Sequence, residues 1–276
     1  MTQDGFPPLT LTEWRLARDS LHRYAKVLGA IRGALTPKQK HWWHSSLRVT
    51  PKGLSTTGIP FGTTGFKLLL DFSAHRLAVN TDRGQARYVP LAGQTLTTFG
   101  RQVLTALFDL GIPLRSDIVK LGNALPCEYD YAAVERYWCA LQRIDATFKR
   151  FKSQLGSGTS PVQLWPHHFD LALTWFSGRI VPGADPENED AADEQMTFGF
   201  STGDDTIPDA YLYVTAYPQP PELVQMPLPP DIVWHTHDWQ GAVLTYQTLV
   251  EAHRPEKKLL EYLMHVHAMG TKWMTR

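Results

Sequence analysis

The sequence has little cysteine, no excess of charge of either sign and no long apolar run. Its two cysteines, Cys127 and Cys139, cannot form the disulfide framework of a small secreted domain and suit a reducing compartment. Lys plus Arg equals Asp plus Glu at 27 each, so charge provides no reason to expect a nucleic acid or an anionic membrane as partner. No window approaches the roughly 18 apolar residues that a membrane-spanning helix needs. We therefore expect a cytoplasmic protein with no nucleic-acid and no membrane partner.

The 43% of apolar residues is enough for a sizeable core, and their spacing predicts four helices. The first helix should begin at Thr10, which has capping-box spacing with Glu13, and end before Pro37. A second apolar stripe predicts a helix over residues 95–110. Asp130 is a suitable N-cap for a third helix that continues to Leu155. The fourth should start near Pro255.

Two groups of strands lie between these helices. Alternation of apolar and polar residues predicts half-buried strands, and turn residues separate them. The first group comprises residues 45–50, 66–73, 77–81 and 86–90, and the second comprises 162–176, 196–201, 211–217, 233–238 and 242–246. Runs of strands between helices, rather than strict alternation, indicate antiparallel sheets and the α+β class.

The order of elements suggests an internal repeat. An offset of 124 places His44 on His168 and Ser46 on Asp170, and an offset of 128 places Phe72 on Phe200. We therefore predict two related helix–antiparallel strands–helix halves, residues 1–111 and 130–276, joined by a connector at 112–129 and packed as one body. The alternative is that two ordinary α+β halves share this pattern by chance.

The segment Trp165-Pro166-His167-His168-Phe169-Asp170 is the densest group of chemically active side chains. In a continuous strand His168 and Asp170 point to one face, while His167 points to the other. A carboxylate beside an imidazole can orient it as a general base, so His168 and Asp170 are the catalytic candidates. The same two residues could instead be metal ligands, or a hydrogen-bonded structural pair at the end of a sheet.

Further residues are candidates for ligand contact. Tyr213 shares a strand face with two other tyrosines, which is typical of an aromatic pocket wall and of ordinary core alike. Arg179 could bind an anionic group or pair with the acidic loop at 182–194. The complete set of predicted ligand-binding residues is Trp43, His44, Trp165, His167, Arg179, Tyr213 and His235.

Several segments together resemble a known family. They are residues 165–171, 177–178, 193–196 and 213–218, together with Trp14 and residues 41–43. On these motifs the chain resembles an uncharacterised, mostly bacterial family classed as a domain of unknown function. The resemblance covers most of the chain and implies a soluble cytoplasmic protein. It transfers no activity and no catalytic residue.

These observations favour a protein with a small-molecule pocket near the Trp and His strands. If it is an enzyme, His168 oriented by Asp170 would carry a hydrolytic or proton-transfer step. One alternative is a non-catalytic interaction protein or homodimer that uses the proline-dense segment 218–230. The other is a metal-binding protein that uses His168 and Asp170 with His235 and His237. The sequence does not identify a cofactor.

Overall fold

The computed structural model describes residues 5–119, 127–188 and 191–274. Helices and antiparallel sheets make up the fold, which confirms the α+β class. Contacts along the chain divide it into two compact units. The N-terminal unit comprises Thr12–Trp138 and Gln163–Phe169, and the C-terminal unit comprises Met1–Leu11, Cys139–Val162 and Asp170–Arg276. No helix among the described residues has both the length and the apolar content needed to cross a membrane.

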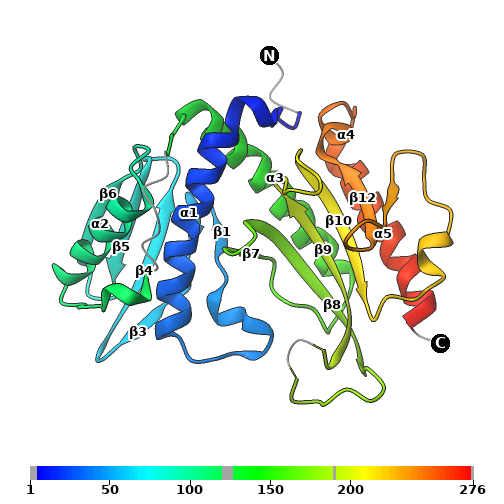
Figure 1. Cartoon of the computed structure of the whole chain (residues 1–276), viewed down its shortest axis with the longest axis horizontal. Coiled ribbons are helices and arrows are strands. Elements are labelled where there is room, and N and C mark those ends of the chain that lie inside the picture. The colour runs from blue at the N-terminus through cyan, green and yellow to red at the C-terminus, as the bar shows by residue number, and fades with distance from the viewer. Residues whose placement is uncertain (1–4, 120–126, 189–190, 275–276) are drawn as a thin grey trace. The chain divides into compact units, whose positions relative to one another are not determined.

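The N-terminal unit combines helices with one antiparallel sheet (Figure 1). The strands follow the order β1-β2-β4-β5-β6, and β3 also pairs with β4. Its elements are α1 (Leu11–Leu35), the 3-10 helix η1 (Lys40–Ser45), β1 (Arg48–Thr50), β2 (Gly53–Ser55), β3 (Ile59–Phe61), β4 (Thr64–Asp71), β5 (Arg76–Thr81), β6 (Ala86–Pro90), α2 (Leu96–Phe108) and the 3-10 helix η2 (Ser116–Ile118).

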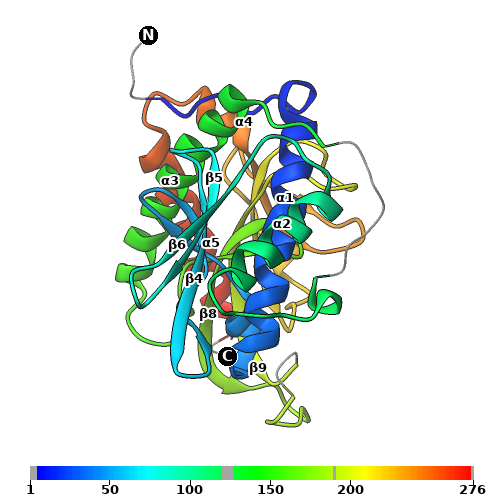
Figure 2. The ribbon, with the colours of Figure 1, turned by 90° about the vertical axis from the view of Figure 1, so that its left-hand side faces the viewer.

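The apolar stripe of α1 forms the centre of this unit. Tyr24 of α1 stacks on Phe99 of α2 with ring centroids 4.1 Å apart, and the Tyr24 hydroxyl donates to the Gln94 carbonyl oxygen at 2.7 Å. Figure 2 shows α1 and α2 on the same side of β4, β5 and β6. Trp14 of α1 stacks on Tyr137 at 5.2 Å, so the core includes the start of the third long helix.

That helix, α3 (Tyr131–Gln154), begins where the sequence predicts. The Asp130 side chain accepts a hydrogen bond from the Ala133 N–H at 2.7 Å, which confirms the predicted N-cap. The division between the two units falls inside α3, after Trp138. The boundary between the predicted halves lies earlier, in the connector at 112–129, of which residues 120–126 lie outside the described part of the chain.

The C-terminal unit has a second antiparallel sheet, whose strands follow the order β11-β12-β10-β9-β8. One face of it packs against α5, where a Cβ at Gly270 would lie 2.4 Å from Met196 of β9. Its elements are β8 (Asp170–Ile180), β9 (Asp193–Ser201), β10 (Tyr211–Tyr217), the 3-10 helix η3 (Leu223–Gln225), β11 (Val233–His235), β12 (Gly241–Thr245), α4 (Tyr246–Val250) and α5 (Pro255–Met274).

The predicted strands at 45–50 and 162–176 are wrong in part. Residues 40–45 form η1, with His41 and Trp42 at φ 56° and 58°, and strand geometry begins at Arg48. The strand expected at 162–176 is two strands, β7 (Gln163–Trp165) and β8, separated by a turn at 166–169. Pro166 has no backbone N–H for a sheet, and Phe169 adopts the left-handed φ of 61°, so alternation of side chains does not continue through the turn.

Candidate ligand-binding site

The sheet face opposite α5 carries aromatic and acidic side chains. Tyr213 of β10 is paired with Gly199 of β9. Its ring lies across that glycine, where a Cβ would come within 2.1–2.4 Å of the ring atoms. The Tyr213 hydroxyl reaches β8 and donates a hydrogen bond to Asp170 Oδ2. Gly199 is therefore required for a tyrosine that spans a neighbouring strand.

A second glycine has the same role on the other side of β10. A Cβ at Gly241, the first residue of β12, would lie 2.8 Å from the Trp239 ring and 2.6 Å from the Val214 carbonyl oxygen. Trp239 belongs to the β11–β12 loop, in which Asp238 adopts a left-handed φ of 63°. The absence of a side chain at Gly241 thus lets the indole fold back toward β10.

Three rings meet at this place. The centroids of Tyr211 and Tyr213 are 6.0 Å apart, and each is 6.2 Å from the centroid of Trp239. The Tyr211 hydroxyl donates to Asp204 Oδ2, which repeats the arrangement of Tyr213 with Asp170. We name these five residues the aromatic cluster. Tyr211 and Asp170 are buried, Tyr213 and Trp239 are half-buried, and Asp204 is exposed.

Burial and the carboxylates keep both phenols protonated. Burial raises the pKa of Tyr213 well above 10, and the Asp170 charge raises it further. Burial also raises the pKa of Tyr211, with smaller contributions from its hydrogen bond to Asp204 and from the Asp204 charge. Neither tyrosine can act as a base near neutral pH. Each phenol is a hydrogen-bond donor, and each ring lies beside a negative charge.

Three of the residues predicted from the sequence come together here. Asp170 and Tyr213 belong to the aromatic cluster, and the His235 ring lies 4.4 Å from the Trp239 ring. The His235 Nε2 is 2.6 Å from the His237 carbonyl oxygen, and β11 ends at His235, so the two imidazoles do not follow strand alternation. Within the described part of the chain, no three His, Cys, Asp or Glu side chains are grouped in a way that could hold a metal ion.

His167 and His168 lie in the turn between β7 and β8, and both are exposed, whereas Asp170 is only 7% exposed. Pro166 packs in a notch on α1, since a Cβ at Gly29 would lie 2.7 Å from its Cγ. The strand geometry from which His168 and Asp170 were expected to share a face is therefore absent.

Phe169 completes the attachment of this turn to the N-terminal unit. It is buried, and its ring lies 5.5 Å from His22 of α1 and 5.5 Å from Tyr137 of α3. The His22 Nε2 lies 3.0 Å from the His167 carbonyl oxygen. The histidine-rich motif thus has a packing role, in which Pro166 and Phe169 are the buried anchors.

The remaining residues that were predicted to bind a ligand do not belong to the aromatic cluster. Trp43 is half-buried in η1, and the buried His44 accepts a hydrogen bond from the Gln39 N–H at 3.2 Å. Trp165 is half-buried at the end of β7. Arg179 is bidentate with Glu194, with Nε 3.0 Å from Oε1 and Nη2 3.1 Å from Oε2. Arg179 therefore pairs with the acidic loop, the second of its two expected roles.

Comparison with known proteins identifies the family of this chain. A family model described as a family of unknown function (DUF5996) matches residues 6–275. The chain belongs to this family. The resemblance seen in the sequence is thereby confirmed, and DUF5996 has no established activity to transfer. No curated protein and no solved structure matches the chain.

In this DUF5996 protein, Asp204 and Trp239 were not predicted as site residues, and Tyr211 was considered only as one of the two tyrosines that share a strand face with Tyr213. Asp204 and Tyr211 meet only because a loop brings them together, and Trp239 is positioned by the glycine at 241. An isolated glycine within a strand often marks the close approach of another group, so Gly199 carried a usable signal.

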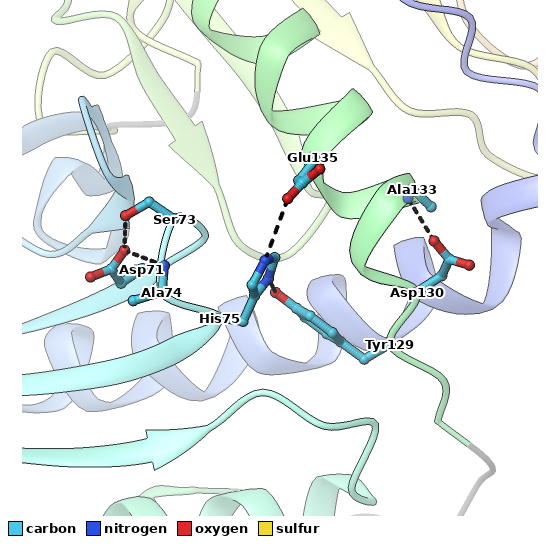
Figure 3. A network of polar contacts seen from close by, with 8 residues as sticks. All are labelled: Asp71, Ser73, Ala74, His75, Tyr129, Asp130, Ala133 and Glu135. Atoms are coloured by element: carbon cyan, nitrogen blue, oxygen red, sulfur yellow. Dashed lines mark hydrogen bonds and ion pairs between the residues drawn. The ribbon is translucent and has the colours of Figure 1, made fainter.

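A polar network in the N-terminal unit was also missed (Figure 3). His75, in the β4–β5 turn, has Nδ1 3.1 Å from the Tyr129 hydroxyl and Nε2 3.7 Å from Glu135 Oε1. Nearby, Asp71 accepts hydrogen bonds from the Ser73 hydroxyl at 2.6 Å and the Ala74 N–H at 3.1 Å. The network connects a hairpin turn to the start of α3, through residues that are far apart in the sequence.

Proposed function

We propose that this protein binds a small molecule and that the aromatic cluster of its C-terminal unit receives a small organic cation. The observation that carries the proposal is the triangle of three rings, with sides of 6.0–6.2 Å, in which two phenols each donate to a carboxylate. Tryptophan and tyrosine faces attract cations through the ring quadrupole.

The carboxylates strengthen this attraction in two ways. Asp170 and Asp204 contribute negative charge next to the rings, and a phenol that donates to a carboxylate has a more electron-rich ring. A cation above the ring triangle could lie within about 6 Å of all three centroids, the range in which the interaction is effective. The half-buried Trp239 and the exposed Asp204 are accessible from solvent.

The ligand class follows from this chemistry. An alkylammonium or quaternary ammonium group offers a weakly hydrated charge with an apolar surface, which suits aromatic faces better than a compact metal ion. Each ring contributes about 0.5–2 kcal/mol, so loss of one ring should weaken binding by roughly 2- to 30-fold.

Calorimetry on the full chain with choline and its neutral isostere 3,3-dimethyl-1-butanol tests the proposal, because the two ligands differ mainly in charge. We expect choline to bind measurably better than the alcohol. Trp239→Leu should weaken choline binding within the range above, and Asp204→Asn should also weaken it. In the Asn variant an amide oxygen can still accept the hydrogen bonds that Asp204 receives from Thr206 and Ile207.

Trp42→Leu is the matched control, since Trp42 is a 47% exposed tryptophan of the N-terminal unit. It should leave choline affinity unchanged. Equal affinity for choline and the alcohol would contradict the proposal that the ligand is a cation. Equal choline binding by wild type and Trp239→Leu would contradict the proposal that the aromatic cluster is the binding site.

The other functional hypotheses remain predictions. A hydrolytic or proton-transfer step at His168 with Asp170 now lacks its geometric argument, because His168 lies in a turn. A homodimer through segment 218–230 would use a segment that already packs within its own chain. Leu223 is 3% exposed, and the Met226 carbonyl oxygen accepts a hydrogen bond from Trp234 Nε1 at 2.8 Å. A cytoplasmic location stays a prediction.

A further inference from the structure

The C-terminal unit has a groove of about 570 Å³. None of the residues that line this groove belongs to the aromatic cluster. Residues from the segment before β11, from β12, from the connection between α4 and α5, and from α5 line it. Its volume falls in the range of about 300–1,000 Å³ that is usual for small-molecule pockets. Three of its lining residues are buried and largely apolar, namely Ile232, Leu244 and Tyr262.

Tyr262 contributes its ring rather than its hydroxyl to this apolar part. The hydroxyl donates a hydrogen bond to the Ala242 carbonyl oxygen at 2.7 Å, so its polar group is already satisfied. The apolar lining can thus accept the hydrocarbon part of a ligand without leaving a buried donor unpaired.

The charged side chains of the lining are three positive and two negative, namely Arg254, Lys257 and Lys258 with Asp231 and Glu261. Lys258 is 2.5 Å from Asp231, and Lys257 is 3.5 Å from Glu261, so both carboxylates of the groove are paired with lysines. Arg254 remains. It is exposed and has no ion pair with any residue in the described part of the chain.

We propose that this groove binds a small organic carboxylate with an apolar body. The hydrocarbon part would lie against Ile232, Leu244 and Tyr262, and the carboxylate would pair with Arg254. A guanidinium presents a planar fork of N–H donors that matches a carboxylate in bidentate geometry, which a lysine cannot do. The net positive rim disfavours a cation of the same shape, so this site is distinct in ligand class from the aromatic cluster.

Calorimetry on the full chain with 3-phenylpropionate, 3-phenylpropanamide and acetate as probes tests both parts of the proposal. The amide keeps the apolar body without the charge, and acetate keeps the charge without the body. We expect saturable binding of 3-phenylpropionate and at least about tenfold weaker binding of either other probe. Equal binding of the amide would overturn the role of Arg254, and equal binding of acetate would overturn the role of the apolar lining.

Variants locate the site. Arg254→Gln should weaken 3-phenylpropionate binding at least about tenfold, and Arg254→Lys should retain only part of the affinity because it keeps the charge without the fork. Arg15→Gln, at an exposed arginine of α1 in the N-terminal unit, is the matched control and should bind as wild type does. Because Arg254 is exposed, its replacement should leave the melting temperature unchanged. Unaltered affinity in Arg254→Gln, or no saturation by 3-phenylpropionate, would overturn the proposal.

Discussion

Single glycines decide which aromatic rings can lie on the C-terminal sheet. Gly199→Ala would place a Cβ within 2.1–2.4 Å of the Tyr213 ring, so the ring has to move and its hydrogen bond to Asp170 should be lost. We expect the free energy of unfolding to fall by about 1–3 kcal/mol, the usual cost of strain or of a buried polar group left unpaired. Urea denaturation checks this.

Gly84→Ala would not serve as a control for that experiment, because Gly84 has a left-handed φ of 77°. Gly58→Ala is suitable, since a Cβ at Gly58 meets no atom within 4 Å and its φ is not left-handed. A loss of stability at Gly58 as large as that at Gly199 would mean that the close contact with Tyr213 is not the cause.

We expect His22 to make the stability of the protein sensitive to acid. Burial, and then the charge of Lys26, lower its pKa from 6.5 to about 4 in the folded state, while the hydrogen bond to His167 and the charge of Asp19 oppose this. The unfolded state therefore takes up a proton first. Stability from His22 is complete above about pH 6.5 and is lost as the pH falls toward 4, by at most roughly 3 kcal/mol.

His22→Gln tests this assignment, because glutamine can still donate to the His167 carbonyl oxygen but does not titrate. Urea denaturation from pH 7.5 to 4 should show a shallower loss of stability in the variant than in the wild type. The pKa of His167 is also lowered to about 4, by partial desolvation of its ring and then by the charges of His168 and Lys26. Its side chain is exposed, so solvent screening makes its contribution smaller than that of His22. Identical pH profiles of wild type and His22→Gln would contradict the prediction.

At the scale of elements, the network around His75 fastens the β4–β5 turn to the start of α3 (Figure 3). Tyr129→Phe removes the phenol next to His75 Nδ1, and we expect a loss of about 1 kcal/mol in the free energy of unfolding. Tyr131→Phe is the control, since Tyr131 is 52% exposed and its ring still packs 4.5 Å from His75. The two variants should differ in urea denaturation, and equal stabilities would show that the phenol has no part in fastening the turn.

The elements also bear on the predicted repeat. Each sheet is a meander that follows a long helix, with β2-β4-β5-β6 after α1 and β8-β9-β10-β12 after α3. The helix after each meander begins in the same way. Thr95 caps α2 through the Thr98 N–H at 3.2 Å, and Thr245 caps α4 through the Thr248 N–H at 3.3 Å. These parallels support the duplication, which remains a prediction.

At the scale of the whole molecule, the compact units do not coincide with the predicted halves. The N-terminal unit includes Tyr137 and Phe169, whose rings stack on each other. The Tyr137 ring also stacks on Trp14, and the Phe169 ring also stacks on His22. A fragment 1–129 lacks both rings, so it should not fold. A fragment 12–169 contains the whole unit and should show more dispersed amide resonances than 1–129.

NMR spectra of the two fragments at equal concentration make this comparison directly. In fragment 12–169, Phe169→Ala should cost about 3–5 kcal/mol, the range for a large buried aromatic residue. A folded 1–129, or a fragment 12–169 insensitive to Phe169→Ala, would contradict the assigned limits of the unit.

Local patterns in the sequence determined the α+β class, the long helices, the cap of α3 at Asp130, and most strands. Periodicity and capping depend on neighbouring residues, so they can be read without the fold. Short-range exceptions were harder to predict. The turn at 166–169 follows from Pro166 and a left-handed Phe169, and strand alternation could not reveal it.

Only the tertiary structure decided which side chains share a site. Asp170 and Tyr213 were both predicted, but their hydrogen bond spans 43 positions and requires a ring laid across Gly199. Asp204 accepts the hydrogen bond of Tyr211 because the loop between β9 and β10 brings the two side chains together. The Trp239 ring can lie near both tyrosines because Gly241 has no side chain. Such contacts depend on strand register and loop closure, which a single sequence specifies only through the complete fold.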